Sequence, residues 1–291
     1  MALLLPLLSF ICGLILASSN LSKLLKYLLS WLLARVFIPI VIIYNMVFYQ
    51  AGSLSLMLFS FCSALLLFFT FLAFSKDRLA ALCFSYTNMA WLGFPIAIAL
   101  FGSDISAAMI ALYIGISIFG NTWAVTSVSS EAQPFKSIMQ KLILSPPILA
   151  LCLALILRAF NWQNLANHQW IDSVYLIAKW GMSFAGMCVL GMWLRQTSVA
   201  WDDVWHSSKI AAVKLFCGVI LCGFAYQFLP IPHIDDVIGV MFLLFCLPPA
   251  ANIVALETHY QGTGVSAKYI ASGTIVSCVV CVGYAVLLRL L

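Results

Sequence analysis

The chain has 291 residues, of which 64% are hydrophobic and 8% are charged, and its formal net charge is +5. Soluble domains carry roughly 25% charged residues, so this composition excludes a soluble globular protein and indicates a polytopic membrane protein. The basic residues are scattered singly between apolar stretches and form no stripe, which excludes a nucleic-acid partner. The expected surrounding is the lipid bilayer.

The apolar stretches predict an all-α transmembrane fold. With about 20 apolar residues taken as one crossing, the chain contains ten predicted spans joined by short connections. No stretch is polar enough to predict a soluble domain. The predicted spans are 2–19, 27–49, 53–74, 79–101, 105–127, 139–160, 172–194, 209–229, 236–256 and 265–289.

Lysine and arginine concentrate in the connections after predicted spans 1, 3, 5, 7 and 9. Because cytoplasmic loops are enriched in basic residues, we expect these connections to face inward and both termini to face outward. The basic residues on the inward side are Lys23, Lys26, Lys76, Arg78, Lys136, Lys141, Arg195, Lys209 and Lys268.

The fourth predicted span carries polar and helix-breaking residues. It contains Asn88, Gly93 and Pro95. Proline lacks an N–H and frees the carbonyl four residues earlier, here that of Trp91. We therefore predict a broken helix, with a second half-helix that begins at Pro95 and directs its unpaired N–H groups toward the bilayer centre.

The ninth predicted span repeats this pattern. Pro248 and Pro249 interrupt it, Asn252 follows, and the carbonyls of Leu244 and Phe245 are expected to be freed. Two interrupted segments in corresponding halves of a chain are typical of a transporter's binding site.

Ten spans with breaks in the fourth and ninth predict two repeats, residues 1–128 and 129–291. Five spans is an odd number, so the second repeat must be inverted in the membrane. The N-terminal ends of the two half-helices then approach the midplane from opposite sides. Each end carries about half a positive charge, and together they predict an anion site without a basic side chain.

Six residues are the predicted substrate-binding set. The hypothesis is that the Asn88 and Asn252 amides hydrogen-bond a carboxylate held at the two helix ends. The freed carbonyls of Trp91, Leu244 and Phe245 are candidate ligands for a cation such as sodium. The full set is Asn88, Gly93, Pro95, Pro248, Pro249 and Asn252.

Charged residues inside the predicted spans are few. Arg35, Lys179 and Lys214 lie within spans, and snorkelling to the nearer interface explains all three; Lys179 is also the candidate outer gate for an anion. No Asp or Glu lies deep in a span, and Glu257 is interpreted as a solvated helix end. Coupling to sodium or to protons stays open.

The segment NMAWLGFPIAIALFG, from Asn88 to Gly102, resembles the fourth span of the auxin efflux carrier family. The segment LPPAANIVALETHYQ resembles the ninth span of that family. The chain departs from the family pattern at Met89 and Ala90, where a smaller pair is usual, and in the eighth span, which lacks a proline. This family is similar to the bile-acid, arsenite and riboflavin type of transporters.

The resemblance implies a bile-acid-symporter-like fold in which helices 4 and 9 are broken and cross at the substrate site. It implies an elevator mechanism, with spans 3 to 5 and 8 to 10 moving against a scaffold of spans 1, 2, 6 and 7 that also forms a homodimer. The implied substrates are small organic anions such as malate, malonate or auxin. The short central connection suggests a bacterial inner-membrane member.

Other functions are weighed against this one. The acidic pairs Asp202-Asp203 and Asp235-Asp236 are reminiscent of membrane prenyltransferases, but the predicted topology puts them on opposite sides, where they cannot share a metal. We expect no enzyme, no metal and no cofactor. A ten-helix drug and metabolite exporter and a passive anion channel remain the alternatives.

Overall fold

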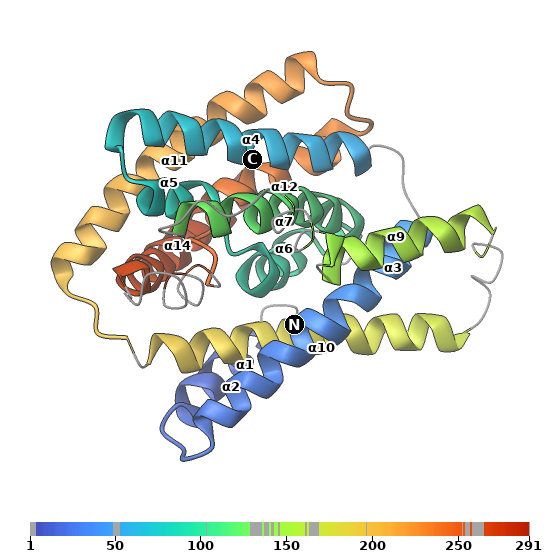
Figure 1. The fold of residues 1–291 in the computed structure, drawn as a ribbon, viewed down its shortest axis with the longest axis horizontal. Helices are drawn as coiled ribbons and strands as arrows, with labels where there is room; N and C mark the ends of the chain where they lie inside the picture. Colours follow the sequence, from blue (N-terminus) through green and yellow to red (C-terminus); the bar gives the residue numbers. More distant parts are fainter. Residues whose placement is uncertain are drawn as a thin grey trace. The chain divides into compact units, whose positions relative to one another are not determined.

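A computed structural model of the chain describes most of its residues (Figure 1). In these residues the structure is helical and contains no strand, and one isolated antiparallel bridge joins two loops. This confirms the predicted all-helical class. The described residues are 4–48, 53–102, 104–128, 136, 140, 143–144, 146–160, 162, 169–195, 197–251, 253, 257 and 265–290.

The chain divides into two compact units, and each is built from segments that are far apart in the sequence. Unit 1 comprises Met1–Ser53, Ala90–Ile110 and Ile143–Gln196. Unit 2 comprises Leu54–Met89, Ala111–Leu142 and Thr197–Leu291.

Unit 1 is organised around the long helix α10, against which α1 and α2 pack, while α3 packs against α9. Figure 1 shows the blue helices α1 and α2 beside the yellow α10. The helices of unit 1 are α1 (Leu4–Leu16), α2 (Ser22–Leu32), the π-helix η1 (Leu33–Phe37), α3 (Ile38–Val47), α6 (Phe94–Phe101), α9 (Pro146–Ala159) and α10 (Gln169–Leu194). The π-helix η2 (Met89–Gly93) leads into α6.

Glycine allows α1 and α10 to touch backbone to backbone. A Cβ added to Gly13 would collide with the carbonyl oxygen of Cys188, and one added to Gly191 would collide with that of Phe10. Small residues that permit such approach are a main source of helix association in membranes, because lipid offers no hydrophobic driving force between apolar helices.

In the part of the chain that the structure describes, each of the two π-helices ends two residues before a proline. Pro39 lies at the second residue of α3, and Pro95 lies at the second residue of α6. A proline ring collides with the carbonyl four residues earlier in an α-helix. A π-turn widens the backbone at that point, so the chain remains helical through each proline.

Unit 2 is built on α11, which packs against both α12 and α14, while α14 also contacts α5. Asp77 begins α5 as its N-cap, and its carboxylate accepts the N–H groups of Leu79 and Ala80 at 2.9 and 3.1 Å. The helices of this unit are α4 (Ser53–Ser75), α5 (Arg78–Ser85), most of α7 (Ser106–Val128), α11 (Trp201–Phe228), α12 (Ile234–Cys246) and α14 (Val265–Leu290).

Five helices within the described residues are long and apolar enough to cross a bilayer. Large apolar side chains also point outward from them; on α11, for example, Phe216, Val219 and Phe224 are more than half exposed. Both features are consistent with an integral membrane protein. The five helices are Ser22–Tyr44, Leu54–Ser75, Trp170–Met192, Trp201–Phe228 and Val265–Leu290.

Shorter apolar helices occupy the regions of predicted spans 1, 4, 5 and 6. They are Leu7–Leu16, Met89–Phe101, Ser106–Gly120 and Ile148–Ala159. At 1.5 Å per residue, the first, second and fourth of these fall short of the roughly 30 Å of a hydrocarbon core. The third is part of α7, whose 23 residues extend about 35 Å.

Candidate functional site

Two interrupted segments of unit 2 meet inside the unit. The first break, residues 86–88, separates α5 from η2, and the second break, residues 247–250, follows α12. The Asn88 N–H donates to the Pro248 carbonyl at 2.9 Å. The two breaks are therefore joined directly by backbone.

A second hydrogen bond closes this pairing. The Ala250 N–H donates to the Tyr86 carbonyl at 2.8 Å, and between the two bonds Thr87 lies opposite Pro249 in an antiparallel bridge. Backbone groups that leave a helix inside hydrocarbon must find partners within the protein. Each break supplies the partners that the other needs.

Local sequence explains where the second break lies. Pro248 and Pro249 have no N–H to donate to α12, and a proline disfavours helical geometry in the residue before it. Leu247 is accordingly extended, with φ −82° and ψ 149°, and α12 ends at Cys246. The predicted half-helix at Pro248 needs a correction, because Pro248 and Pro249 lie in the paired, non-helical stretch.

Glycines of neighbouring helices allow the breaks to pack closely. The ring of Tyr86 rests on Gly120 of α7, where a Cβ would collide with it. Pro249 rests on Gly273 of α14, where a Cβ would lie 3.0 Å from the proline Cδ. The pairing is thus held between α7 and α14.

Two polar side chains of the first break are buried. Asn88 is 4% exposed and Thr87 is 3% exposed. The Thr87 hydroxyl has no hydrogen-bond partner in the described part of the chain. The sequence analysis predicted Asn88 as a site residue but missed Thr87. The sequence offered no indication of Thr87 except that it lies next to Asn88. A buried unpaired hydroxyl is costly, which makes Thr87 a candidate ligand contact.

Gly93 and Pro95 lie outside this pairing. Both belong to unit 1, and the helical backbone runs without interruption from Met89 through Pro95 to Phe101. The prediction of a break at Pro95 was wrong, because the π-helix η2 accommodates the proline. The break lies instead directly before Met89.

The three carbonyls predicted to hold a cation have different surroundings. The Trp91 carbonyl faces α10, and a Cβ on Gly186 would lie 2.8 Å from this oxygen. Leu244 and Phe245 lie in the last turn of α12 and are buried. Their role as cation ligands stays a prediction.

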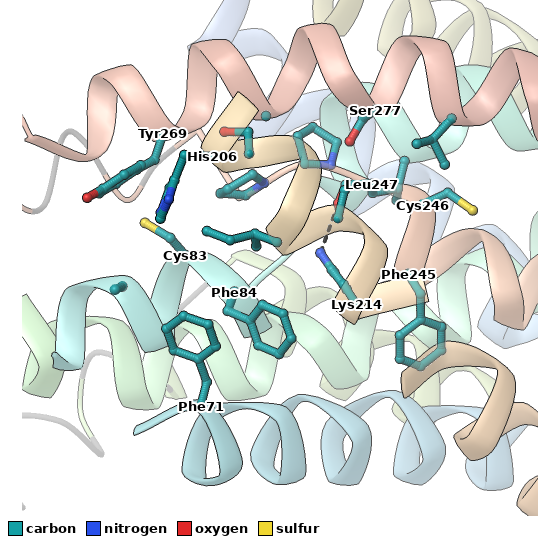
Figure 2. A pocket seen from close by; sticks show the side chains of 18 residues that line it. Phe71, Cys83, Phe84, His206, Lys214, Phe245, Cys246, Leu247, Tyr269 and Ser277 are labelled. Atoms are coloured by element: carbon teal, nitrogen blue, oxygen red, sulfur yellow. Dashed lines mark hydrogen bonds between the residues drawn. The ribbon is translucent and has the colours of Figure 1, made fainter. Parts of the chain in front are cut away.

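A lysine reaches the second break from α11. The Lys214 ammonium donates to the Leu247 carbonyl at 2.8 Å (Figure 2), and the side chain is 4% exposed. The expectation that Lys214 snorkels to the interface was wrong, because this face of α11 points toward α12. The positive charge stabilises the carbonyl end of α12.

The predicted gate residue, Lys179, lies on α10 in unit 1. It is 8% exposed, and its ammonium stands 5.7 Å from the ring centre of Tyr175. That ring stacks on Tyr44, whose hydroxyl donates to Asp172 at 2.8 Å. Lys179 is therefore held by an aromatic neighbour, and its role as a gate stays a prediction.

Glu257 is buried, against the expectation of a solvated helix end. Its carboxylate accepts the N–H groups of Val265 and Ser266 at 2.7 and 2.8 Å, and the Ser266 hydroxyl as well. These N–H groups begin α14 and have no partner within that helix. Asn252, the second predicted amide ligand, lies outside the described residues.

The acidic pairs lie at opposite ends of α11. Asp202 and Asp203 are in its first turn, whereas Asp235 hydrogen-bonds Tyr226 near its other end. At 1.5 Å per residue the 28-residue helix is about 40 Å long. Among the described residues, no group of three or more His, Cys, Asp or Glu side chains is placed to hold a metal ion.

Compared with models of protein families and with curated proteins, the chain matches none. The resemblance to the auxin efflux carrier family therefore stays a prediction from the two sequence motifs.

Proposed function

We propose that this protein is a secondary carrier of small organic anions, and that the paired breaks are its substrate site. The observation that carries the proposal is the antiparallel pairing of residues 86–88 with 247–250 inside a unit of apolar helices. Interrupted helices that meet within a membrane are typical of transporter binding sites, where polar backbone and side chains must face a ligand.

The charges near the breaks favour an anion. Lys214 brings a positive charge to the second break. The carboxylate of Glu257, in contrast, is hydrogen-bonded to the first N–H groups of α14. Asn88 and Thr87 add an amide and a hydroxyl to the same region. Such donors can hydrogen-bond a carboxylate as its hydration water is removed.

The transport cycle we propose is an elevator. Unit 2 holds both breaks and the helices of predicted spans 3, 5, 8 and 10, together with α5 and α12. We propose that it moves as one body, while unit 1 forms the scaffold and the homodimer contact. The two inverted repeats, the bacterial inner membrane and the outward termini belong to the same proposal.

Transport by purified protein in liposomes tests this function. Uptake of radiolabelled malonate and indole-3-acetate should be saturable, and unlabelled anion on the opposite side should stimulate it. Flux that rises linearly with concentration at single-channel rates would identify a pore instead. Uptake of organic cations without anions would identify an exporter of the drug and metabolite type.

Substitutions at the first break sharpen the test. Asn88→Ala should lower uptake at least tenfold in protein that still inserts, and Thr87→Val should raise the half-saturating concentration. Ser85→Ala is the matched control, because Ser85 is equally buried but its hydroxyl donates to the Ala81 carbonyl of its own helix at 2.8 Å. Normal uptake by Asn88→Ala would remove the paired breaks from the substrate path.

A further inference from the structure

A pocket in unit 2 opens beside the second break. Helices α4, α5, α11 and α14 form its walls together with residues 245–249, and its empty volume is about 650 Å³ with its open mouth included. Figure 2 shows the aromatic side chains of Phe71, Phe84 and Phe245 around it. A mainly apolar lining with a few polar groups is typical of a small-molecule site.

Lys214 contributes the one amine among the described residues that line this pocket. Its ammonium has three N–H donors, and the Leu247 carbonyl takes one of them. Within the described residues, no carboxylate forms an ion pair with it. Cys83 and Cys246 also line the pocket, and their thiols lie close enough to the ammonium to interact with it electrostatically.

Burying an ammonium away from water costs several kcal/mol, and a neighbouring anion offsets part of this cost. Charged groups inside membrane proteins tend to mark ligand pathways for this reason. A carboxylate in the pocket would supply both the missing negative charge and acceptors for the two remaining N–H donors.

We propose that this pocket binds an apolar monocarboxylic acid, with the Lys214 ammonium as counter-charge and the three phenylalanines as the wall for the hydrocarbon body. The proposal rests on the proposed function for its role in transport, and it names the substrate class. A dicarboxylate is disfavoured, because its second charge would be buried against aromatic rings without a partner.

The N-terminal parts of α11 and α14 add polar side chains to the lining of the pocket. His206, which is exposed, stands 5.9 Å from Tyr269, measured between ring centres. Behind them, the hydroxyls of Ser207 and Ser272 form a hydrogen bond of 2.7 Å that ties α11 to α14.

Binding to the purified full-length protein in nanodiscs tests the proposal without any need for transport. The probes are 4-phenylbutyrate, its neutral amide and malonate, measured by calorimetry at pH 7, where carboxylic acids are ionised. We expect 4-phenylbutyrate to bind at least tenfold more tightly than the amide and than malonate. Equal binding of acid and amide, or tighter binding of malonate, would overturn the proposal.

Lysine variants locate the charge. Lys214→Met should lower the affinity for 4-phenylbutyrate at least tenfold, and Lys214→Arg should retain most of it. Lys209→Met is the matched control on the same helix, because the Lys209 side chain is exposed and lies over the Trp205 ring at 5.3 Å. An unchanged affinity in folded Lys214→Met would contradict the assigned role.

If Lys214→Met does not fold, protection of cysteines from alkylation in the unaltered protein tests the proposal instead. In the unaltered protein, 4-phenylbutyrate should slow the alkylation of Cys83 and Cys246, measured peptide by peptide with N-ethylmaleimide. Alkylation of the exposed Cys62 and Cys152 should not change. Equal rates at Cys83 and Cys246 with and without the acid would show that the pocket is not the binding site.

The source of the acid is decided by comparing 4-phenylbutyrate with palmitate. Tighter binding of the former indicates a water-soluble acid, and tighter binding of the latter a membrane fatty acid. The two proposals can fail separately. Selective acid binding without saturable transport would refute the carrier and keep the pocket, whereas saturable malonate transport without acid binding would do the reverse.

Discussion

Unit 1 and unit 2 are both built from apolar helices, yet their interiors differ in kind. Buried polar side chains are sparse in the described part of unit 1, where α1 and α10 instead meet through glycines. In unit 2 they are frequent and include the charged Lys214 and Glu257, whereas Lys179 is the one buried charged residue in the described part of unit 1. Apolar close packing suits a static body, whereas buried polar groups in a membrane mark a ligand path.

The difference also concerns how each unit treats proline. In unit 1, Pro39 and Pro95 are absorbed by π-helices and the backbone remains helical. In unit 2, Pro248 and Pro249 end α12 and pair with the first break. Proline therefore causes a local widening of the helix in unit 1, whereas in unit 2 it ends a helix and forms part of the candidate substrate site.

The largest effect is expected from glycine in unit 1. Gly13→Ala should lower the free energy of unfolding by about 3 kcal/mol, because the methyl group meets the Cys188 backbone, which cannot turn aside. Unfolding in mixed SDS micelles measures this change. The control is Gly223→Ala in α11, where an added Cβ has nothing within 4 Å. If both variants unfold alike, close packing does not hold α1 to α10.

A somewhat smaller effect is expected from the buried carboxylate of unit 2. Glu257→Gln should lower the free energy of unfolding by about 2 kcal/mol. The substitution replaces the carboxylate, which accepts the N–H groups of Val265 and Ser266, by a neutral amide that is a weaker acceptor. The same micelle titration measures it, with the exposed Asp202→Asn as control. Unchanged stability would mean that α14 does not need this cap.

The helix that leads into the first break provides a further test. Asp77→Ala should cost about 1 kcal/mol, because the N–H groups of Leu79 and Ala80 lose their acceptor. Asp77→Asn keeps a capping oxygen and should recover most of the loss. Hydrogen exchange of the α5 amides reports the effect locally, and faster exchange confined to other helices would contradict it.

The smallest effect concerns the contact between α11 and α14. Ser207→Ala should cost about 0.6 kcal/mol, the average for a hydrogen bond between membrane helices, because it removes the bond to Ser272. Ser208→Ala is the control, since that hydroxyl donates to the Val204 carbonyl of its own helix. A larger loss for Ser208→Ala than for Ser207→Ala would show that the polar contact does not stabilise unit 2.

The sequence located the second break because its cause is local. Two consecutive prolines cannot continue a helix in any surrounding. The sequence also pointed to Asn88, since an amide in an apolar span is costly wherever it lies. It misplaced the first break at Pro95, because a single proline can be absorbed by a π-turn and the choice depends on packing.

Lys214 and Glu257 show what the sequence could not decide. A lysine several residues inside a span can snorkel or turn inward, and only the helix face that meets α12 settles which. Glu257 follows a span and resembles a solvated end until α14 presents its unpaired N–H groups to it.

The sequence by itself determined that the chain is helical, has the composition of a membrane protein and is interrupted at 247–250. Hydropathy is a property of each side chain, and a proline lacks its N–H whatever residues surround it, so neither depends on tertiary structure. Tertiary structure alone decided which backbone completes that interruption and which charge stands beside it. Both outcomes depend on residues far apart in the sequence, such as Asn88 with Pro248 and Lys214 with Leu247.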